Sequence, residues 1–256
     1  ASWDWHYLWQ PLAQRNLVIA CDMLGFGDSA KPLDHEYCLL AQADLQQALL
    51  DFLRVEQPVH VLAHDYGDSV AQELLARHYE GRFAMASCVF LNGGLFPETH
   101  RPALVQKLLL SPIGWMIGRA FGRNALSDSF GQIFGPNTRP SESALDDFWS
   151  LISCNDGPRI LHKLIAYIPQ RRRLRERWVA AMQRDGVPMR VIDGEVDPIS
   201  GAHMVERYHQ LVPNADSVLL ANIGHYPQIE APVLVLKHYL EFRERMGQPA
   251  SCVAYS

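Results

Sequence analysis

Short apolar runs separated by helical patterns set the rhythm of this chain. Two largely apolar runs rich in β-branched residues, Leu17–Asp22 and Val59–Asp65, each end in an aspartate. Such runs are typical of strands buried on both faces, as in a parallel sheet. Each is followed by a glycine-containing turn and then by a helical pattern, notably Ser69–Tyr79. Three later runs predict further strands: Ala86–Asn92, Met189–Gly194 and Ser217–Ala221.

Strands that alternate with helices predict an α/β fold with a mostly parallel sheet flanked by helices. Later helices are expected around Val205–Val212 and over Val233–Arg245. The rhythm breaks between Leu95 and Arg184, where apolar residues recur at helical spacing, glycine and proline interrupt, and no convincing strand occurs. We therefore expect a helical cap inserted into a discontinuous core. The expected bounds are 95–184 for the cap and 1–94 with 185–256 for the core.

Composition excludes several classes of protein. The chain has 256 residues, is 48% hydrophobic, and carries 23 Lys and Arg against 28 Asp and Glu, so its net charge is −5. This balance argues against nucleic-acid binding, which needs a basic face. The basic run Arg171–Arg177 is interpreted as a solvated helix face, because Trp178 lies at helical spacing from Leu174. No apolar run reaches the ~18 residues of a transmembrane helix.

The cysteines and the N-terminus bear on the compartment. Five scattered cysteines without a Cys-x-x-Cys pair fit reduced thiols better than disulfides or a zinc site, which favours the cytoplasm. Ala1–Trp5 lacks a starting Met, a basic segment and an apolar segment, so it is not a signal peptide and has the character of a cut end. The cysteines are Cys21, Cys38, Cys88, Cys154 and Cys252.

An abrupt strand-to-helix turn is the first candidate for chemistry. In Ala63-His64-Asp65-Tyr66-Gly67, small residues stand two positions before and two positions after Asp65. This is the pattern of a nucleophile elbow, a strained turn that lifts one side chain clear of the sheet. Asp65 alone is explained equally well as a helix N-cap. His64, beside it, is expected to pack or to hydrogen-bond beneath the turn.

Two further polar residues follow predicted strands. Asp197 precedes Pro198, which favours an extended or turn conformation just past the strand Met189–Gly194. His225 follows the last predicted strand. Open α/β sheets bind ligands at these strand ends. Asp65, Asp197 and His225 also occur in the order nucleophile, acid, histidine that α/β-hydrolases use, so we predict that they form a catalytic triad.

An aspartate at the elbow narrows the chemistry. A carboxylate is ionised at neutral pH and can attack an sp³ carbon without a base, giving an alkyl-enzyme ester. His225, oriented by Asp197, would then deprotonate the water that hydrolyses this ester, and the backbone N–H of Tyr66 would stabilise the oxyanion. The expected substrates are small apolar electrophiles, such as epoxides and alkyl halides. A serine esterase is disfavoured because Ser69 lies within the helix.

The choice between epoxide and halide depends on proton and hydrogen-bond donors in the cap. An epoxide needs a proton on its departing oxygen, whereas a halide needs N–H donors. Tyr167 is the only tyrosine between Leu95 and Arg184, so it is the candidate acid, with a buried structural role as the alternative. The tryptophans of this segment are interpreted as core residues: Trp115, Trp149 and Trp178.

Ala63–Asp68, together with Val70–Leu75, resembles the epoxide hydrolase and haloalkane dehalogenase branch of the α/β-hydrolase superfamily. Two longer strings, Asn92–Pro102 and Phe134–Ser143, extend the resemblance to one subgroup of that branch and over nearly the whole chain. The resemblance implies a hydrolase core, a helical cap and the triad named above. It implies no particular substrate.

One feature of the resembled branch is missing. Its His-Gly-x-Pro loop, which supplies a second oxyanion donor, would precede Trp3–Tyr7 and is absent together with the strands before it. One lost strand would lie between the strand ending at Asp22 and the one ending at Asp65, leaving unpaired edges within the sheet. We therefore expect a chain that is truncated at its N-terminus and is poorly stable or inactive by itself.

The leading hypothesis is a cofactor-independent, epoxide hydrolase-like enzyme. Two alternatives remain open. A haloalkane dehalogenase is disfavoured because Tyr66 stands where a halide-binding Trp is usual in that family, and a catalytically idle binding protein is allowed by the absent loop. No metal-ligand spacing occurs among the histidines, and Gly25-Phe26-Gly27 lacks the rest of a phosphate-binding fingerprint. The oligomeric state is not predicted.

Overall fold

A single parallel sheet organises the molecule. The computed structural model describes residues 1–247 and 253–255, and its strands follow the order β1-β6-β2-β3-β4-β5, with every pair parallel. All five strands predicted from the sequence are present, which confirms the α/β class. The bounds are β1 Val18–Ala20, β2 Val59–His64, β3 Met85–Leu91, β4 Met189–Gly194, β5 Ser217–Leu220 and β6 Val253–Tyr255.

The gap expected between β1 and β2 is filled. β6 pairs with β1 through Val18↔Val253 and with β2 through His60↔Val253. The expectation of unpaired edges at this place is therefore wrong for the paired residues, because β6 pairs with 18–20 of β1 and with 60–62 of β2. A segment from the other end of the sequence thus keeps the sheet continuous, which sequence adjacency does not reveal.

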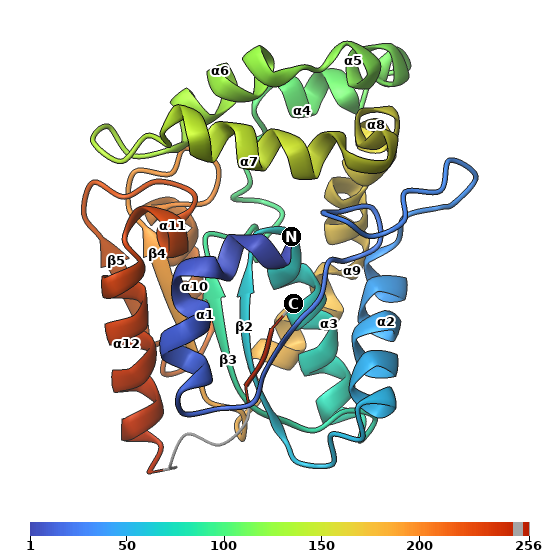
Figure 1. Cartoon of the computed structure of the whole chain (residues 1–256). Helices are drawn as coiled ribbons and strands as arrows, with labels where there is room; N and C mark the ends of the chain where they lie inside the picture. The colour runs from blue at the N-terminus through green and yellow to red at the C-terminus, as the bar shows by residue number, and fades with distance from the viewer. Residues whose placement is uncertain (248–252, 256) are drawn as a thin grey trace.

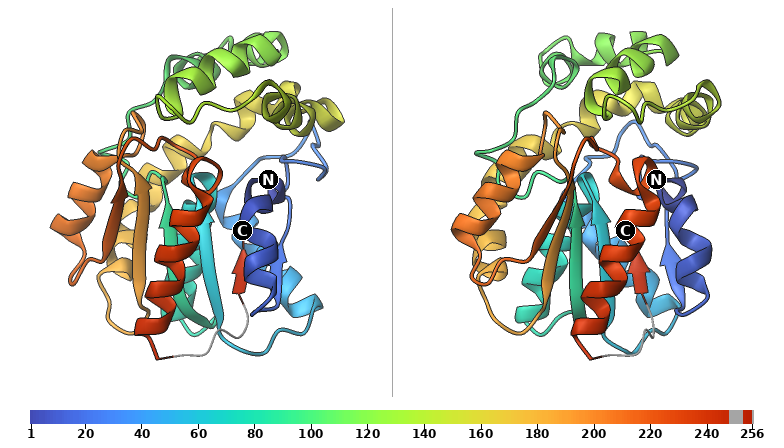
Figure 2. Two further views of the ribbon diagram at one scale, coloured as in Figure 1. Left: turned by 60° about the vertical axis from the view of Figure 1, so that its left-hand side comes forward. Right: turned by 90° about the vertical axis from the view of Figure 1, so that its left-hand side faces the viewer.

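Helices cover both faces of the sheet (Figures 1 and 2). On one face, α1 and α12 pack their apolar side chains into a cluster with β2, β3 and β4. On the other face, α2, α3, α9 and α10 enclose the larger core. The bounds are α1 His6–Ala13, α2 Leu39–Phe52, α3 Tyr66–Tyr79, α9 Tyr167–Met182, α10 Ala202–Leu211, α11 Pro227–Glu230 and α12 Pro232–Arg245, preceded by a 3-10 turn at Ser2–Trp5.

Residues 95–184 contain helices and no strand. Most of these helices lie across the carboxyl ends of the strands (Figure 1). Phe130, Phe134 and Phe148 form a small core of this layer and pack against Tyr226 of the sheet domain. The division into cap and core remains our proposal. The bounds are α4 Leu104–Leu109, α5 Gly114–Ala120, α6 Arg123–Ile133, α7 Glu142–Ser153, α8 Leu161–Leu164 and a 3-10 segment Cys154–Ile160.

The tryptophans of residues 95–184 are only partly core residues, although the sequence pattern predicts that all of them are. Trp178 is buried as expected, but Trp115 is 47% exposed, because its helix turns that face away from the molecule. Cysteines 21, 38, 88 and 154 are free thiols, whereas Cys252 lies outside the described residues. Within the described chain, no helix is both long enough and apolar enough to cross a bilayer.

Candidate active site

Asp65 occupies the turn between β2 and α3. Its backbone has φ 45° and ψ −104°, a left-handed conformation that costs energy for any residue with a Cβ. Ala63 and Gly67 keep the flanks of the turn small, as the sequence pattern indicated. Although Asp65 holds the N-cap position, its side chain makes no capping hydrogen bond. The N-cap interpretation therefore does not account for this carboxylate, which stands at the carboxyl end of the sheet.

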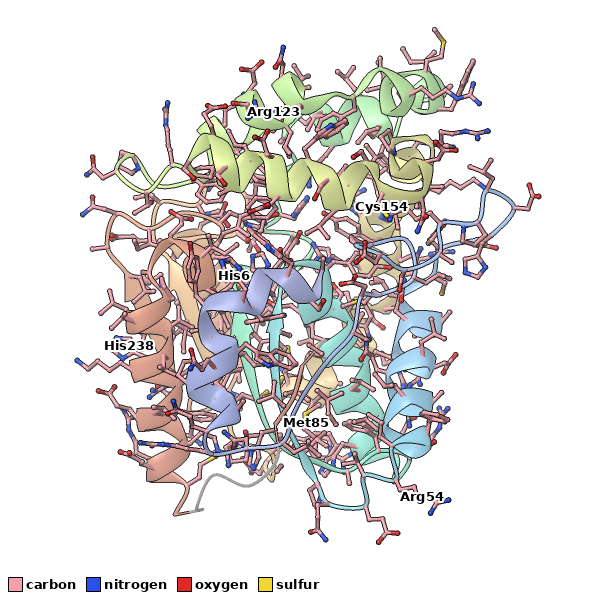
Figure 3. All side chains as sticks on the ribbon, viewed as in Figure 1. His6, Arg54, Met85, Arg123, Cys154 and His238 are labelled. Atoms are coloured by element: carbon pink, nitrogen blue, oxygen red, sulfur yellow. The ribbon has the colours of Figure 1, made fainter. Side chains whose placement is uncertain are left out.

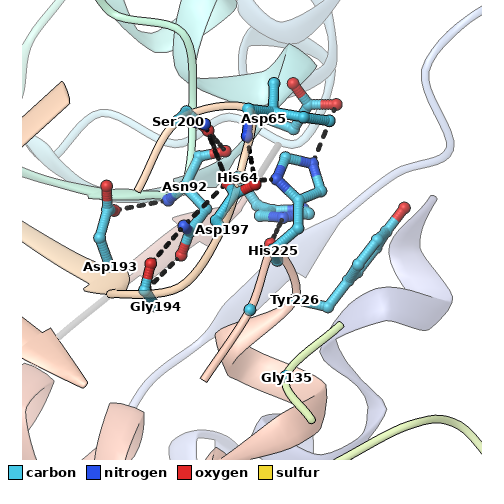
Figure 4. Close-up of polar contacts among 12 residues, drawn as sticks. His64, Asp65, Asn92, Gly135, Asp193, Gly194, Asp197, Ser200, His225 and Tyr226 are labelled. Atoms are coloured by element: carbon cyan, nitrogen blue, oxygen red, sulfur yellow. Dashed lines mark hydrogen bonds and ion pairs between the residues drawn. The ribbon is translucent and has the colours of Figure 1, made fainter. Parts of the chain in front are cut away.

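His225 lies between the two aspartates that the sequence singled out (Figure 4). Its Nδ1 donates a hydrogen bond of 2.8 Å to Asp197 Oδ2, and its Nε2 faces Asp65 Oδ2 at 3.7 Å. The carboxylate of Asp197 accepts only, which fixes the proton on Nδ1 when the ring is neutral. Nε2 is then left with a lone pair directed toward the elbow. The fold thus brings all three predicted triad residues together.

Asp197 is held by groups that the sequence analysis missed. Asn92 Nδ2 donates to its Oδ2 at 3.0 Å, Ser200 Oγ donates to the same oxygen at 2.8 Å, and the N–H of Ile199 donates to Oδ1 at 2.8 Å. Asn92 directly follows β3 and has φ 38°, so its place just past a strand was a usable signal. These bonds orient the carboxylate and support its ionised form.

The pKa values of His225 and Asp65 are shifted in opposite directions. Burial opposes the charged form of His225, but the carboxylates of Asp197 and Asp65 together raise its pKa well above the usual range. Burial likewise opposes ionisation of Asp65, yet His225 and Arg171 hold the pKa of Asp65 well below its ordinary value. Asp65 is therefore an ionised carboxylate at neutral pH, as a nucleophile requires.

His64 is neutral and contacts the triad. Burial, reinforced by His225, lowers the pKa of His64 to about 4. Its Nε2 donates to the carbonyl oxygen of His225 at 2.8 Å, and its ring lies 4.8 Å from that of Tyr226. The expected hydrogen bond at the elbow is thus present. It ties the strand end of β2 to the loop that carries His225.

Arg171 is a buried part of the site rather than a solvated residue. It is 2% exposed, so interpreting the basic run as a solvated helix face is wrong at this position. Its Nη2 donates to the backbone oxygen of Asp65 at 2.8 Å and lies 3.4 Å from Asp65 Oδ1. Its Nε donates to Ser69 Oγ at 2.6 Å. Because Arg171 stands on α9, a helix of the inserted segment, this segment directly braces the strained elbow.

A cavity of about 270 Å³ opens above Asp65 between the sheet and the cap. Asp65, Tyr66 and His64 form its floor, and the cap contributes mainly apolar side chains. The N–H of Tyr66 belongs to the first turn of α3, where amides have no acceptor within the helix. The lining also includes Phe26, Phe130, Phe148, Leu151, Ile152, Leu161, Leu164 and Tyr226. This composition suits a small apolar molecule.

The two tyrosines nearest the elbow differ in placement. Tyr167 is buried, its hydroxyl accepts a hydrogen bond from Gln106 Nε2 at 3.2 Å, and its ring packs under the Arg171 guanidinium. It is not among the residues that line the cavity. Tyr226 does line the cavity, and its ring lies 5.3 Å from that of His225. The sequence analysis overlooked Tyr226 because it sought an acid only within the cap.

The described residues offer no metal site. No group of three or more His, Cys, Asp or Glu side chains in 1–247 and 253–255 is arranged to hold a metal ion. The polar residues that line the cavity include Asp4, His64, Asp65 and Tyr226.

Comparisons with known proteins agree with this architecture. A family model described as alpha/beta hydrolase fold matches residues 1–232. The Mesoderm-specific transcript protein of Mus musculus is 42% identical over 254 residues, covering 94% of this chain and 75% of that protein.

Solved structures share the fold at low sequence identity. The epoxide hydrolase CorEH matches with a TM-score of 0.72 and 20% identity, covering 96% of this chain and 88% of that one. A loop variant of haloalkane dehalogenase DbeA from Bradyrhizobium elkanii matches with a TM-score of 0.71 and 18% identity, covering 97% and 88%. These similarities show that the fold is shared, and they do not identify the reaction.

Proposed function

The chain belongs to the alpha/beta hydrolase fold family, and from that premise we propose that it is a hydrolase acting through a covalent alkyl-enzyme ester on Asp65. One observation carries the proposal. The residue at the elbow is a carboxylate, and Nε2 of His225, a side chain placed to act as a base, lies 3.7 Å from its Oδ2. A hydroxyl nucleophile would need that base for its own activation, whereas an ionised carboxylate leaves the base free to activate water.

The reaction has two steps. In the first, an Asp65 carboxylate oxygen attacks an sp³ carbon of the substrate, the carbon–oxygen or carbon–halogen bond breaks, and an ester forms. In the second, His225 Nε2 takes a proton from water, and the hydroxide adds to the ester carbonyl carbon. The N–H of Tyr66 stabilises the resulting oxyanion. Collapse expels the alcohol, which takes a proton from His225, and leaves Asp65 as the carboxylic acid. Loss of that proton to the acid that opened the ring, or to solvent after halide departure, regenerates the carboxylate.

Ester formation also prepares the base. The high pKa of His225 depends partly on the negative charge of Asp65. Once Asp65 is esterified that charge is gone, so the pKa of His225 falls toward the neutral range. The histidine is therefore a stronger candidate for a neutral base in the intermediate than in the free protein. Asp197 continues to orient the ring and to stabilise the imidazolium that forms during hydrolysis.

An epoxide is the proposed substrate class. Its departing oxygen needs a proton, and phenols stand close to the elbow, whereas Tyr66 occupies the position after the nucleophile and offers no indole N–H to a halide. Haloalkane dehalogenation is the second candidate, since both leaving groups depart from an sp³ carbon. The epoxide hydrolase and haloalkane dehalogenase structures described above share only the fold with this chain.

Oxygen labelling tests the covalent route. In a single turnover with an epoxide in ¹⁸O-water, the diol should carry no label, because its new oxygen comes from the Asp65 carboxylate. The peptide containing Asp65 should gain one ¹⁸O instead, detected by mass spectrometry. Later turnovers should transfer that label to product. Label in the first product with none in the enzyme would mean direct attack by water and would contradict the proposal.

Tyr226 is our candidate for the ring-opening acid alongside Tyr167. Tyr226 faces the cavity, and burial raises its pKa well above the ordinary value, so the phenol stays protonated. Tyr226→Phe should slow epoxide-driven ester formation by about 10²-fold or more. Tyr167→Phe tests the other candidate and should change this rate little, because Tyr167 does not line the cavity.

Single-turnover kinetics with two electrophiles, followed by stopped flow, distinguish an acid role of Tyr226 from a packing role. An alkyl halide needs no proton on its leaving group, so Tyr226→Phe should react with it nearly as fast as the unmodified protein does. Equal losses with epoxide and halide would indicate a packing role for Tyr226. A larger loss in Tyr167→Phe than in Tyr226→Phe would assign the acid to Tyr167.

A further inference from the structure

Exposed apolar side chains concentrate on α4, α5 and the turn between these helices. Six large apolar side chains that are exposed in the described part of the chain fall within residues 104–116, and Leu104, Ile113 and Met116 are 72%, 52% and 52% exposed. α5 lies in the upper part of the cap in Figure 1, and side chains project outward around it in Figure 3. We define the cap patch by these residues: Leu104, Leu108, Leu110, Ile113, Trp115 and Met116.

The packing of α4 against α5 forces this exposure. α4 turns Leu109 into the core, and α5 turns Ile117 the same way. Gly114 sits so close to the carbonyl oxygen of Leu109 that an added Cβ would lie 1.9 Å from it. With Gly114 pressed inward, its neighbours Ile113 and Trp115 point outward. The patch therefore follows from the fold of the cap and is not a frayed end.

The sequence of the two patch helices and their flanks carries charge of one sign. From Thr99 to Ser127 the sequence has no Asp or Glu, although the whole chain has a net charge of −5. The same stretch contains four cations: Arg101, Lys107, Arg119 and Arg123. Arg123 is paired with Glu142 and Asp146, but Lys107 and Arg119 are exposed on the patch helices. The Arg119 guanidinium lies 5.3 Å from the centre of the Trp115 ring.

We propose that the cap patch docks the protein on the surface of an anionic lipid bilayer. Its apolar side chains, an exposed tryptophan and flanking long cations with no carboxylate among them match the composition of interfacial helices. Exposed patches of this kind are unusual in monomers and mark interaction sites. A second copy of this chain fits less well, because the patch would place the same cations opposite each other.

Docking would also orient the cap that roofs the cavity. Cap residues Leu151, Leu161 and Leu164 line the cavity, and α5 packs against α8, which carries two of them. An apolar substrate concentrates in a bilayer, so the cap would be held beside its source. The docking proposal itself stands on the surface of the cap and does not depend on the reaction at Asp65.

Vesicle sedimentation tests the proposal with the whole chain. We expect binding to vesicles of phosphatidylcholine with about 30% phosphatidylserine, and weaker binding to pure phosphatidylcholine. The double variant I113D/W115D should bind at least about tenfold more weakly, since each change removes an apolar anchor and adds a negative charge. Phe52→Asp is the control. Phe52 is 83% exposed on α2, away from the cap, and its variant should bind like the unmodified protein.

Two further measurements complete the test: vesicle binding after reversal of the patch cations, and the oligomeric state in solution. Lys107→Glu with Arg119→Glu should lose the preference for anionic vesicles, by about fivefold for each cation removed. Thermal melts of all variants should match, because the altered side chains are exposed. Three results would overturn the proposal: no binding to either vesicle, binding unchanged in I113D/W115D, or a dimer in solution that this double variant dissociates.

Discussion

Replacing Asp65 by asparagine is expected to reduce turnover by about 10⁴-fold or more, the scale seen when a nucleophile is removed from a catalytic triad. The amide keeps the size of the side chain but has no charge with which to attack carbon. Multiple-turnover rates with an epoxide check this, and intact mass must show that the asparagine has not been hydrolysed back to aspartate. Unchanged turnover would mean that Asp65 is not the nucleophile.

Asp68 provides the matched control for that substitution. It lies three residues further along, in the first turn of α3, and burial together with Asp193 raises its pKa well above the usual range. Because burial favours the uncharged form of this carboxyl, Asp68→Asn places a neutral group of nearly the same size in the same environment. Activity should stay close to that of the unmodified protein. The pair therefore separates the chemistry of Asp65 from a general sensitivity of the helix start.

The second large effect concerns His225→Gln. Asp65 can still form the ester without the base, but hydrolysis should slow by about 10²–10⁴-fold. After incubation with an epoxide, the intact mass should rise by the mass of the whole epoxide, because ring opening keeps every atom. With an alkyl halide, the adduct should lack the halogen. Peptide mapping should place either adduct on Asp65.

The double variant D65N/H225Q is the control for this trap. It has no ionised nucleophile at the elbow, so it should gain no mass from either electrophile. An adduct that persists in the double variant would place the reaction elsewhere. The absence of any adduct in His225→Gln, with epoxides and halides alike, would point to a binding protein or to a different electrophile.

The sequence located the triad because each residue follows a strand. Parallel strands bring their carboxyl ends to one edge of the sheet, so Asp65, Asp197 and His225 meet there whatever their separation along the chain. In the structure His225 Nδ1 lies 2.8 Å from Asp197 Oδ2, and His225 Nε2 lies 3.7 Å from Asp65 Oδ2. Their assignment as nucleophile, orienting acid and base remains a prediction of the chemistry.

Arg171 shows the limit of that reasoning. In the sequence it opens a run of arginines, and the periodicity of α9 alone does not say which one turns inward. The packing of α9 on α3 buries Arg171 against Asp65, whereas Arg175 reaches the surface and pairs with Glu98. Tyr226 escaped notice for a similar reason. It follows His225 directly, and only the fold of its loop turns the ring into the cavity.

Local patterning by itself determined the strands, the main helices, the elbow and the order of the catalytic candidates, because hydrophobic period and turn chemistry act over a few residues. Contacts between distant segments were decided only in the tertiary structure. They include β6 between β1 and β2, Asn92 on Asp197, and the cap helix carrying Arg171 against the elbow. Such pairings depend on how complete elements pack in space, and a pattern read along one segment holds no information about its partner.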